Sequence, residues 1–412
     1  MRYPEYLPKG GTIGFVAPSF GCNIEPYKSG FDNAQKKFKD LGYSLQLGPN
    51  CYAGEGIGIS NSPQKCADEL MEAYCDETSD VLISCGGGEL MCEILSYMDF
   101  ERIKAAKPKW YMGYSDNTNF AYLQATICDT AAVYGPCAPA FGMEPWHPVI
   151  SDALALLTGK KTALTSYGMW EKESLKTDEN PCAPYNLTEK SVLHNFPEGD
   201  VAMEGRLLGG CLDCLGNICG TKYDAVEAFC EKYKEDGILW FMEACDLHVF
   251  DIRRALWRLK NAGWFKYVKG FIFGRPVHFG QDVMGLNQYT AVTDMLKEFH
   301  VPIIMDADLG HLPPSMPLIT GAMAKVEEEL AEVKEAAAAD DAKALEEELG
   351  DLLFTVVNLC RWKNLQAEEV IHGGIRKFVE RFKNMESLIH VKGSTPEEMM
   401  EAWRKAKLNA EC

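Results

Sequence analysis

Short apolar runs alternate with amphipathic stretches over the first hundred residues. The strand-like runs lie at residues 12–18, 43–47 and 81–85, and apolar side chains recur at helical spacing in residues 27–41 and 66–74. Strands that alternate with helices are typical of a parallel sheet covered on both faces, with ligands at the carboxyl ends of its strands. We therefore predict an α/β fold whose N-terminal domain, residues 1–155, is a doubly wound parallel sheet.

The periodic pattern lapses and then returns. Residues 156–203 are irregular and contain Pro181, Pro184 and Pro197, which predicts a linker or crossing loop. Strand-like and helical runs resume beyond it, so we predict a second α/β domain with a mixed sheet over residues 204–325. Its predicted strands are residues 237–242, 268–273 and 301–305, and its predicted helix is residues 252–262.

The composition changes abruptly after residue 325. Glu, Ala, Leu and Lys dominate, and apolar residues such as Leu345, Leu349 and Leu352 form stripes at helical spacing. This pattern predicts an all-α helical module over residues 326–412. Exposed apolar stripes on so short a segment need a partner, so we expect a homodimer or a higher homo-oligomer.

Composition and charge narrow the function classes. The chain has 412 residues, of which 47% are hydrophobic and 25% charged, as in ordinary globular proteins. Its net charge of -19 argues against nonspecific nucleic-acid binding, because a phosphate backbone would be repelled. The N-terminus lacks an apolar signal region, and no apolar run approaches 18 residues, so we expect a cytoplasmic protein with no membrane contact.

The sixteen cysteines are scattered through apolar runs, which favours reduced, buried thiols over disulfides. Cys211 and Cys214 form a Cys-x-x-Cys pair. No second pair stands at zinc spacing, so structural cysteines are the favoured interpretation over a metal knuckle.

The candidate nucleophile is Ser115, which follows an aromatic, strand-like run and stands two residues after Gly113. The Asp-Asn-Thr sequence after it supplies helix N-cap residues, and the amides of that helix start would face a developing oxyanion. A plain strand-to-helix loop is the alternative.

The Gly-Gly-Gly run at residues 86–88 ends the preceding strand and is either a tight turn or a place where bare amides approach a ligand. The chain has no dinucleotide fingerprint there, which favours an oxyanion hole.

Several motifs together resemble the serine LD-carboxypeptidases, which include murein tetrapeptide carboxypeptidase and the microcin C immunity peptidases. The resemblance covers residues 8–325. It rests on residues 12–18, 85–88, 113–118, 205–210, 310–311 and 317–321 and on Glu243 at a strand end.

The resemblance implies a hydrolase with Ser115 as nucleophile, His311 as general base and Glu243 as the carboxylate that orients the histidine. It also implies an oxyanion hole at the amides of Asp116 and of Gly87 and Gly88, and it implies no cofactor. The expected substrate is a small peptide ending in a D-amino acid, as in murein peptide recycling. The alternative is a peptidyl-nucleotide of the microcin type. Cys211 departs from the family, which commonly has Asn there.

Elementary chemistry agrees with these roles. A serine hydroxyl is inert until a base removes its proton, and an imidazole needs a carboxylate to fix its tautomer. Without the resemblance, Glu243 could equally be a surface residue at a strand end and His311 a loop histidine.

Carboxylates cluster in the predicted helical module. Glu328, Glu329 and Glu332 stand one helical turn apart, and Glu348 and Asp351 repeat that spacing. Like charges at such spacing repel unless a cation neutralises them, and oxygen-only ligands suit Mg²⁺ or Mn²⁺. On charge alone, a solvated acidic face is the favoured alternative.

Residues 327–332, 345–354 and 377–382 resemble the MazG-type nucleotide pyrophosphohydrolases. This resemblance favours a Mg²⁺ site at the five carboxylates, a nucleoside triphosphate as substrate, and phosphate contacts from Lys377 and Arg381. Ile375 stands where that family usually has Asn, and the helix that normally precedes the first glutamates is missing. Two alternatives stay open: a pyrophosphohydrolase whose α/β part only binds ligand, and a tail that serves oligomerisation alone.

Overall fold

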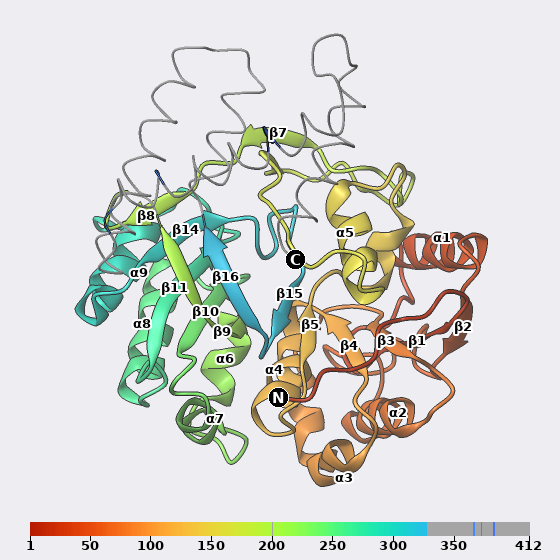
Figure 1. The fold of residues 1–412 in the computed structure, drawn as a ribbon. Coiled ribbons are helices and arrows are strands. Elements are labelled where there is room, and N and C mark those ends of the chain that lie inside the picture. The colour runs from red at the N-terminus through yellow and green to blue at the C-terminus, as the bar shows by residue number, and fades with distance from the viewer. Residues whose placement is uncertain (200, 328–365, 367–371, 373–381, 384–412) are drawn as a thin grey trace. The chain divides into compact units, whose positions relative to one another are not determined.

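The computed structural model describes residues 1–199, 201–327, 366, 372 and 382–383. Residues 1–327 form one compact unit and residues 328–412 a second. The first two residues of the predicted helical module, Val326 and Glu327, lie in a strand (Met323–Glu327) and not in a helix. The module's metal carboxylates, Lys377 and Arg381 lie outside the described residues. The architecture given below is that of the first unit, which Figure 1 shows in colour.

The first sheet has six strands in the order β15-β5-β4-β3-β1-β2. Its five N-terminal strands are parallel, and β15 is antiparallel to β5. These strands are β1 (Thr12–Val16), β2 (Ser44–Leu47), β3 (Val81–Ser84), β4 (Trp110–Gly113), β5 (Ala132–Tyr134) and β15 (Leu318–Thr320).

Helices cover both faces of this sheet. Phe31 and Phe38 of α1 pack with α5 on one face, while Leu70 of α2 packs with α3 and α4 on the other. The doubly wound parallel sheet predicted from the sequence is therefore confirmed. The helices are α1 (Tyr27–Asp40), α2 (Pro63–Cys75), α3 (Phe100–Ala105), α4 (Thr118–Thr126) and α5 (Pro148–Leu157), with 3-10 turns η1 (Met91–Tyr97), η2 (Ser115–Asn117) and η3 (Ala138–Gly142).

The second sheet has the order β16-β9-β10-β11-β14-β8. Its four central strands are parallel and both edge strands are antiparallel, so the predicted mixed sheet is confirmed. The strands are β8 (His194–Phe196), β9 (Ala202–Cys211), β10 (Ile238–Glu243), β11 (Val268–Gly274), β14 (Ile303–Ala307) and β16 (Met323–Glu327).

One large core joins this sheet to its helices. Trp240 and Met242 of β10 pack there with Leu256 of α8, and Tyr122 and Leu123 of α4 join the same core, so α4 is shared by the two sheets. The helices are α6 (Leu212–Ile218), α7 (Val226–Lys232), α8 (Val249–Asn261) and α9 (Gln288–Leu296), with η4 (Lys297–Phe299). Two small hairpins complete the fold: β6 (Met169–Glu171) with β7 (Leu187–Lys190), and β12 (Asp282–Val283) with β13 (Leu286–Asn287).

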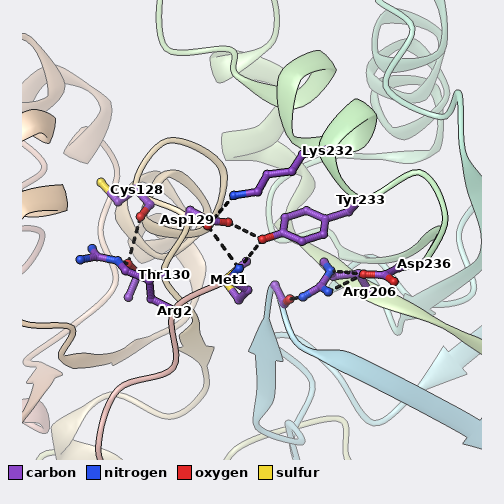
Figure 2. Close-up of polar contacts among 10 residues, drawn as sticks. Met1, Arg2, Cys128, Asp129, Thr130, Arg206, Lys232, Tyr233 and Asp236 are labelled. Atoms are coloured by element: carbon purple, nitrogen blue, oxygen red, sulfur yellow. Dashed lines mark hydrogen bonds and ion pairs between the residues drawn. The ribbon is translucent and has the colours of Figure 1, made fainter.

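Polar contacts also hold the two sheets together away from the core. Lys232 Nζ and the Tyr233 hydroxyl, at the end of α7, both lie 2.6 Å from the carboxylate of Asp129, which follows α4 (Figure 2). The guanidinium of Arg206 on β9 lies 3.9 Å above the Tyr233 ring and pairs with Asp236. These contacts hold the two sheets against each other at the surface, in addition to the core that they share.

None of the helices that the structure describes has the length and apolarity needed to span a bilayer. The fourteen cysteines among the described residues are all free thiols, and nine of them are buried.

Candidate active site

Ser115 sits in a strained turn between β4 and α4. Its backbone φ is 62°, which lies in the left-handed region. This conformation is energetically unfavourable for residues other than glycine. The turn begins directly after Tyr114, and η2 then leads into α4. The Ser115 amide donates a hydrogen bond to the Tyr134 hydroxyl at 3.1 Å. The turn therefore presents the Ser115 hydroxyl at the carboxyl edge of the first sheet.

His311 and Glu243 come from the second sheet and complete a hydrogen-bonded series with Ser115. His311 Nε2 lies 2.9 Å from Ser115 Oγ, and His311 Nδ1 lies 2.8 Å from Glu243 Oε2. Glu243 is the last residue of β10 and is 2% exposed. In the neutral imidazole, Nδ1–H donates a hydrogen bond to Glu243, and Nε2 accepts a hydrogen bond from the Ser115 hydroxyl.

The electrostatics of this pair keep the carboxylate ionised. Burial alone would raise the pKa of Glu243, but the charge of His311 and hydrogen bonds from His311 and Tyr134 outweigh it, so its pKa lies below the ordinary value. Burial lowers the pKa of His311, but the charge of Glu243 and hydrogen bonds with Cys245 and Glu243 outweigh burial and raise this pKa well above its ordinary value. An imidazolium beside this carboxylate is thus strongly stabilised.

A buried ion pair holds the loop that carries His311. Arg275 Nη2 lies 2.7 Å from Asp308 Oδ1, and both side chains are 1% exposed. The Asp308 carboxylate also accepts hydrogen bonds from Ser166 and Ser191 of the crossing segment, at 2.6 and 3.0 Å. Gly310 has a φ of 101°, and a Cβ there would lie 2.7 Å from Glu243 Oε2, so only glycine lets the loop approach this closely.

The glycine loop after β3 lies beside Ser115. A Cβ on Gly87 would stand 3.1 Å from Ser115 Oγ, whereas Gly88 packs against Ser19 and Phe20. The Asp116 carboxylate is buried and accepts hydrogen bonds from Ser19 Oγ at 2.6 Å and from the Met91 amide at 2.9 Å. These bonds fasten the Ser115 turn to the loops around it.

The cysteine pair borders the same turn. Cys214 Sγ lies 3.7 Å from the Ser115 carbonyl oxygen, and the Cys211 amide donates to Thr118 at 3.0 Å. Among the described residues there is no group of three or more His, Cys, Asp or Glu side chains that could hold a metal ion.

Tyr134 is a site residue that sequence reasoning missed. Its hydroxyl donates a hydrogen bond to Glu243 Oε1 at 2.5 Å and accepts one from the Ser115 amide. The residue is 1% exposed. The sequence signal was slight. Tyr134 ends a short apolar strand just before Gly135, the kind of position at which parallel strands present functional side chains.

A serine, a histidine and a carboxylate in hydrogen-bonded series at the carboxyl ends of two α/β sheets are characteristic of serine hydrolases. Comparison with known families gives the particular one. Residues 13–135 match the LD-carboxypeptidase N-terminal domain, residues 204–326 match the LD-carboxypeptidase C-terminal domain, and residues 320–385 match the MazG nucleotide pyrophosphohydrolase domain. The chain therefore belongs to the LD-carboxypeptidase family and carries an appended MazG domain, as both resemblances predicted.

Some individual relatives match the peptidase part of the chain and others match the MazG part. YocD of Bacillus subtilis, a carboxypeptidase by name, is 24% identical over 330 residues, which are 79% of this chain and 96% of the relative. The MazG nucleoside triphosphate pyrophosphohydrolase/pyrophosphatase of Thermotoga maritima is 50% identical over 92 residues, 21% of this chain. The chain spans only 35% of that relative's length.

Solved structures share the fold of the first unit. The MccF-like protein from Bacillus anthracis superposes with a TM-score of 0.69 at 23% identity, covering 80% of this chain and 96% of its own. The microcin C7 self-immunity protein MccF, solved in complex with aspartyl sulfamoyl adenosine, gives a TM-score of 0.66 at 23% identity, covering 78% of this chain and 95% of its own.

Proposed function

We propose that residues 1–327 act as a serine carboxypeptidase that hydrolyses the amide bond to a C-terminal D-amino acid of a small peptide. The observation that carries this proposal is the continuous series from Ser115 Oγ through His311 to Glu243, at 2.9 and 2.8 Å. Membership of the LD-carboxypeptidase family supports the choice of bond.

The proposed reaction runs in two halves. Ser115 Oγ attacks the scissile carbonyl carbon while His311 Nε2 takes the hydroxyl proton, and Glu243 stabilises the imidazolium that results. His311 then returns that proton to the leaving amine, which frees the D-amino acid and leaves an acyl ester on Ser115. Water, deprotonated by His311, hydrolyses the ester and restores the serine.

The oxyanion would form beside the glycine loop. The closeness of Gly87 to Ser115 Oγ supports a role for its amide, and the amide of Asp116 opens the turn that leads into α4. A Cβ on Gly88 would clash with Ser19 Oγ, so a side chain does not fit there. We therefore propose that the oxyanion is held by the amides of Asp116 and of the Gly87 and Gly88 turn.

A second substrate class is an aminoacyl-nucleotide. MccF, which shares this fold, has been solved with aspartyl sulfamoyl adenosine bound, and the MccF-like protein from Streptococcus pneumoniae with AMP. The same nucleophile and base would cleave such an amide. The matches to LD-carboxypeptidase domains, and a relative that is a carboxypeptidase by name, make the peptide our first choice.

The MazG domain is proposed to be a nucleotide pyrophosphohydrolase in which Glu328, Glu329, Glu332, Glu348 and Asp351 hold Mg²⁺. A donor set made only of carboxylate oxygens fits that ion, and Lys377 and Arg381 are proposed to contact phosphate. When bound, Mg²⁺ would neutralise the phosphate charge during hydrolysis. These residues lie outside the described part of the chain.

The experiment is a substrate panel on wild type and the Ser115→Ala variant. L,D-tetrapeptides, acyl sulfamoyl adenosines and nucleoside triphosphates are each incubated with both proteins, and products are separated by mass. We expect D-alanine release by wild type and a loss of at least a thousandfold in the variant. Ser96→Ala, an exposed serine outside the site, is the matched control. Full release by Ser115→Ala would refute the nucleophile.

A further inference from the structure

The hydrogen bonds around Ser115 form a closed ring that includes Tyr134. Beginning at the Ser115 amide, the ring passes to the Tyr134 hydroxyl at 3.1 Å and on to Glu243 Oε1 at 2.5 Å. It leaves through Glu243 Oε2 to His311 Nδ1 at 2.8 Å and returns from His311 Nε2 to Ser115 Oγ at 2.9 Å. Tyr134 thus contacts both ends of the proposed catalytic series.

The direction of each bond around Tyr134 is settled by its partners. The Ser115 amide can only donate, so the Tyr134 oxygen accepts there. The Glu243 carboxylate can only accept, so the Tyr134 proton lies on that side. Burial and the charge of Glu243 raise the pKa of Tyr134 well above its ordinary value, and the hydroxyl therefore keeps its proton over the working range. The Tyr134 hydroxyl thus accepts one hydrogen bond and donates another.

We propose that Tyr134 is a positioning residue of the active site, which fixes the left-handed turn of Ser115 and shares the charge of Glu243. The proposal rests on the serine hydrolase function proposed above. Tyr134 is 1% exposed, so in this proposal its hydroxyl acts through Ser115 and Glu243 and not on the substrate directly.

The first consequence concerns the nucleophile. The Ser115 backbone, at a φ of 62°, is held in a conformation that a free chain rarely adopts. Removal of the acceptor of its amide leaves a half-buried donor without that partner and weakens the restraint on the Ser115 backbone and side chain. Attack on the carbonyl then slows, while substrate binding, which does not use Tyr134, changes little.

The second consequence concerns proton affinity. The Tyr134 hydroxyl stabilises the Glu243 carboxylate most when His311 is neutral, because an imidazolium already compensates that charge. Without the hydroxyl, the charged form of His311 is favoured, and the pKa of His311 rises further. The other titratable groups that face the pair include Tyr114, Cys211, Cys214, Cys245 and Glu89, and none of them is changed when only the hydroxyl is removed.

The test compares Tyr134→Phe with Tyr122→Phe. Tyr122 is also a buried tyrosine, on α4, and among the described residues its hydroxyl has no hydrogen-bond partner. In Tyr134→Phe we expect kcat to fall about ten- to a hundredfold, as for one lost hydrogen bond to a charged group, with KM within about twofold. The acidic limb of the kcat/KM profile should move to higher pH. Tyr122→Phe should match wild type in kcat, in KM and in the acidic limb of the kcat/KM profile.

An NMR titration of the His311 ring gives a readout that needs no substrate. The signal is assigned through a His311→Gln variant of the full chain, and its pKa is compared in wild type, Tyr134→Phe and Tyr122→Phe. We expect a higher pKa in Tyr134→Phe alone. An unchanged kcat, or an unchanged His311 pKa in a folded Tyr134→Phe protein, would overturn the proposal. Wild type that cleaves no L,D-peptide refutes the proposed substrate, while the NMR comparison still decides on Tyr134.

Discussion

The protonation of His311 depends mainly on one residue, Glu243. Hydrolysis needs the neutral imidazole, so activity should be absent at low pH and should rise as the pH passes through the raised pKa of His311. Replacing Glu243 with Gln removes the charge that raises this pKa. We expect the acidic limb of kcat/KM to move to lower pH and kcat to fall about 10²- to 10⁴-fold, because the tautomer is no longer fixed.

Glu89→Gln is the matched control for this prediction. Glu89 is an exposed carboxylate near the site. Its pKa lies above the ordinary value, because desolvation and the neighbouring carboxylates outweigh the lowering effect of His311. It makes no hydrogen bond to His311 that would fix the imidazole. Its substitution should shift the acidic limb only slightly and leave kcat near wild type. An acidic limb that moves upward in Glu243→Gln would contradict the assignment.

At this scale the sequence predicted positions but not contacts. Ser115 and His311 follow recognisable strands and Glu243 ends one, and the carboxyl ends of parallel strands are where functional side chains gather. That placement brings them into one hydrogen-bonded series, and their catalytic roles stay predictions. Tyr134 could not be found in this way, because its partner Glu243 lies 109 residues away and nothing local records where a buried hydroxyl points.

At the scale of elements, the loop after β14 depends on Asp308. Asp308→Asn would leave Arg275, which is 1% exposed, as a buried charge without its carboxylate. Removing one partner of a buried ion pair typically costs about 3–5 kcal/mol. We expect a loss of that size in the free energy of unfolding, measured with denaturant, and a lower kcat because the His311 loop loses its attachment.

Asp251→Asn on α8 supplies the comparison. Asp251 also faces an arginine, Arg254, but this pair is exposed and lies within one helical turn. Exposed pairs contribute about 0–1 kcal/mol, so the variant should unfold close to wild type. Equal losses in the two variants would show that the burial of Arg275 and Asp308 is not what stabilises the loop.

Periodic elements were predictable and edge strands were not. The sequence placed α1 and β10 within one residue of their observed bounds, because each has a strong apolar pattern. It began α2 three residues late, because it gave no weight to Pro63 as a first helical residue. β8 and β15 are three residues long, too short for a periodic signal, and their places in the two sheets are set by long-range pairing.

At the scale of the whole molecule, the two family matches overlap in residues 320–326. The structure assigns most of that overlap to the peptidase fold, because β16 pairs with β9 from Met323 to Glu327. The sequence alone showed only that two motifs meet there. β16 is an edge strand of the second sheet, and the first unit ends at its last residue, Glu327.

The chain has two compact units, and the catalytic residues proposed for each lie in that unit alone, so we expect the two activities to be independent. In the full chain, Ser115→Ala should lose peptide hydrolysis and keep Mg²⁺-dependent release of pyrophosphate from nucleoside triphosphates at the wild-type rate. Glu348→Gln should show the reverse, because it removes one of the proposed metal carboxylates. Glu346→Gln is the control and should keep both activities, because Glu346 stands two positions before Glu348 and so lies on another face of the predicted helix.

Both assays are run on one preparation of each variant. Loss of both activities in either single variant would show that the units depend on each other, and absence of nucleotide turnover in wild type would refute the proposed second activity.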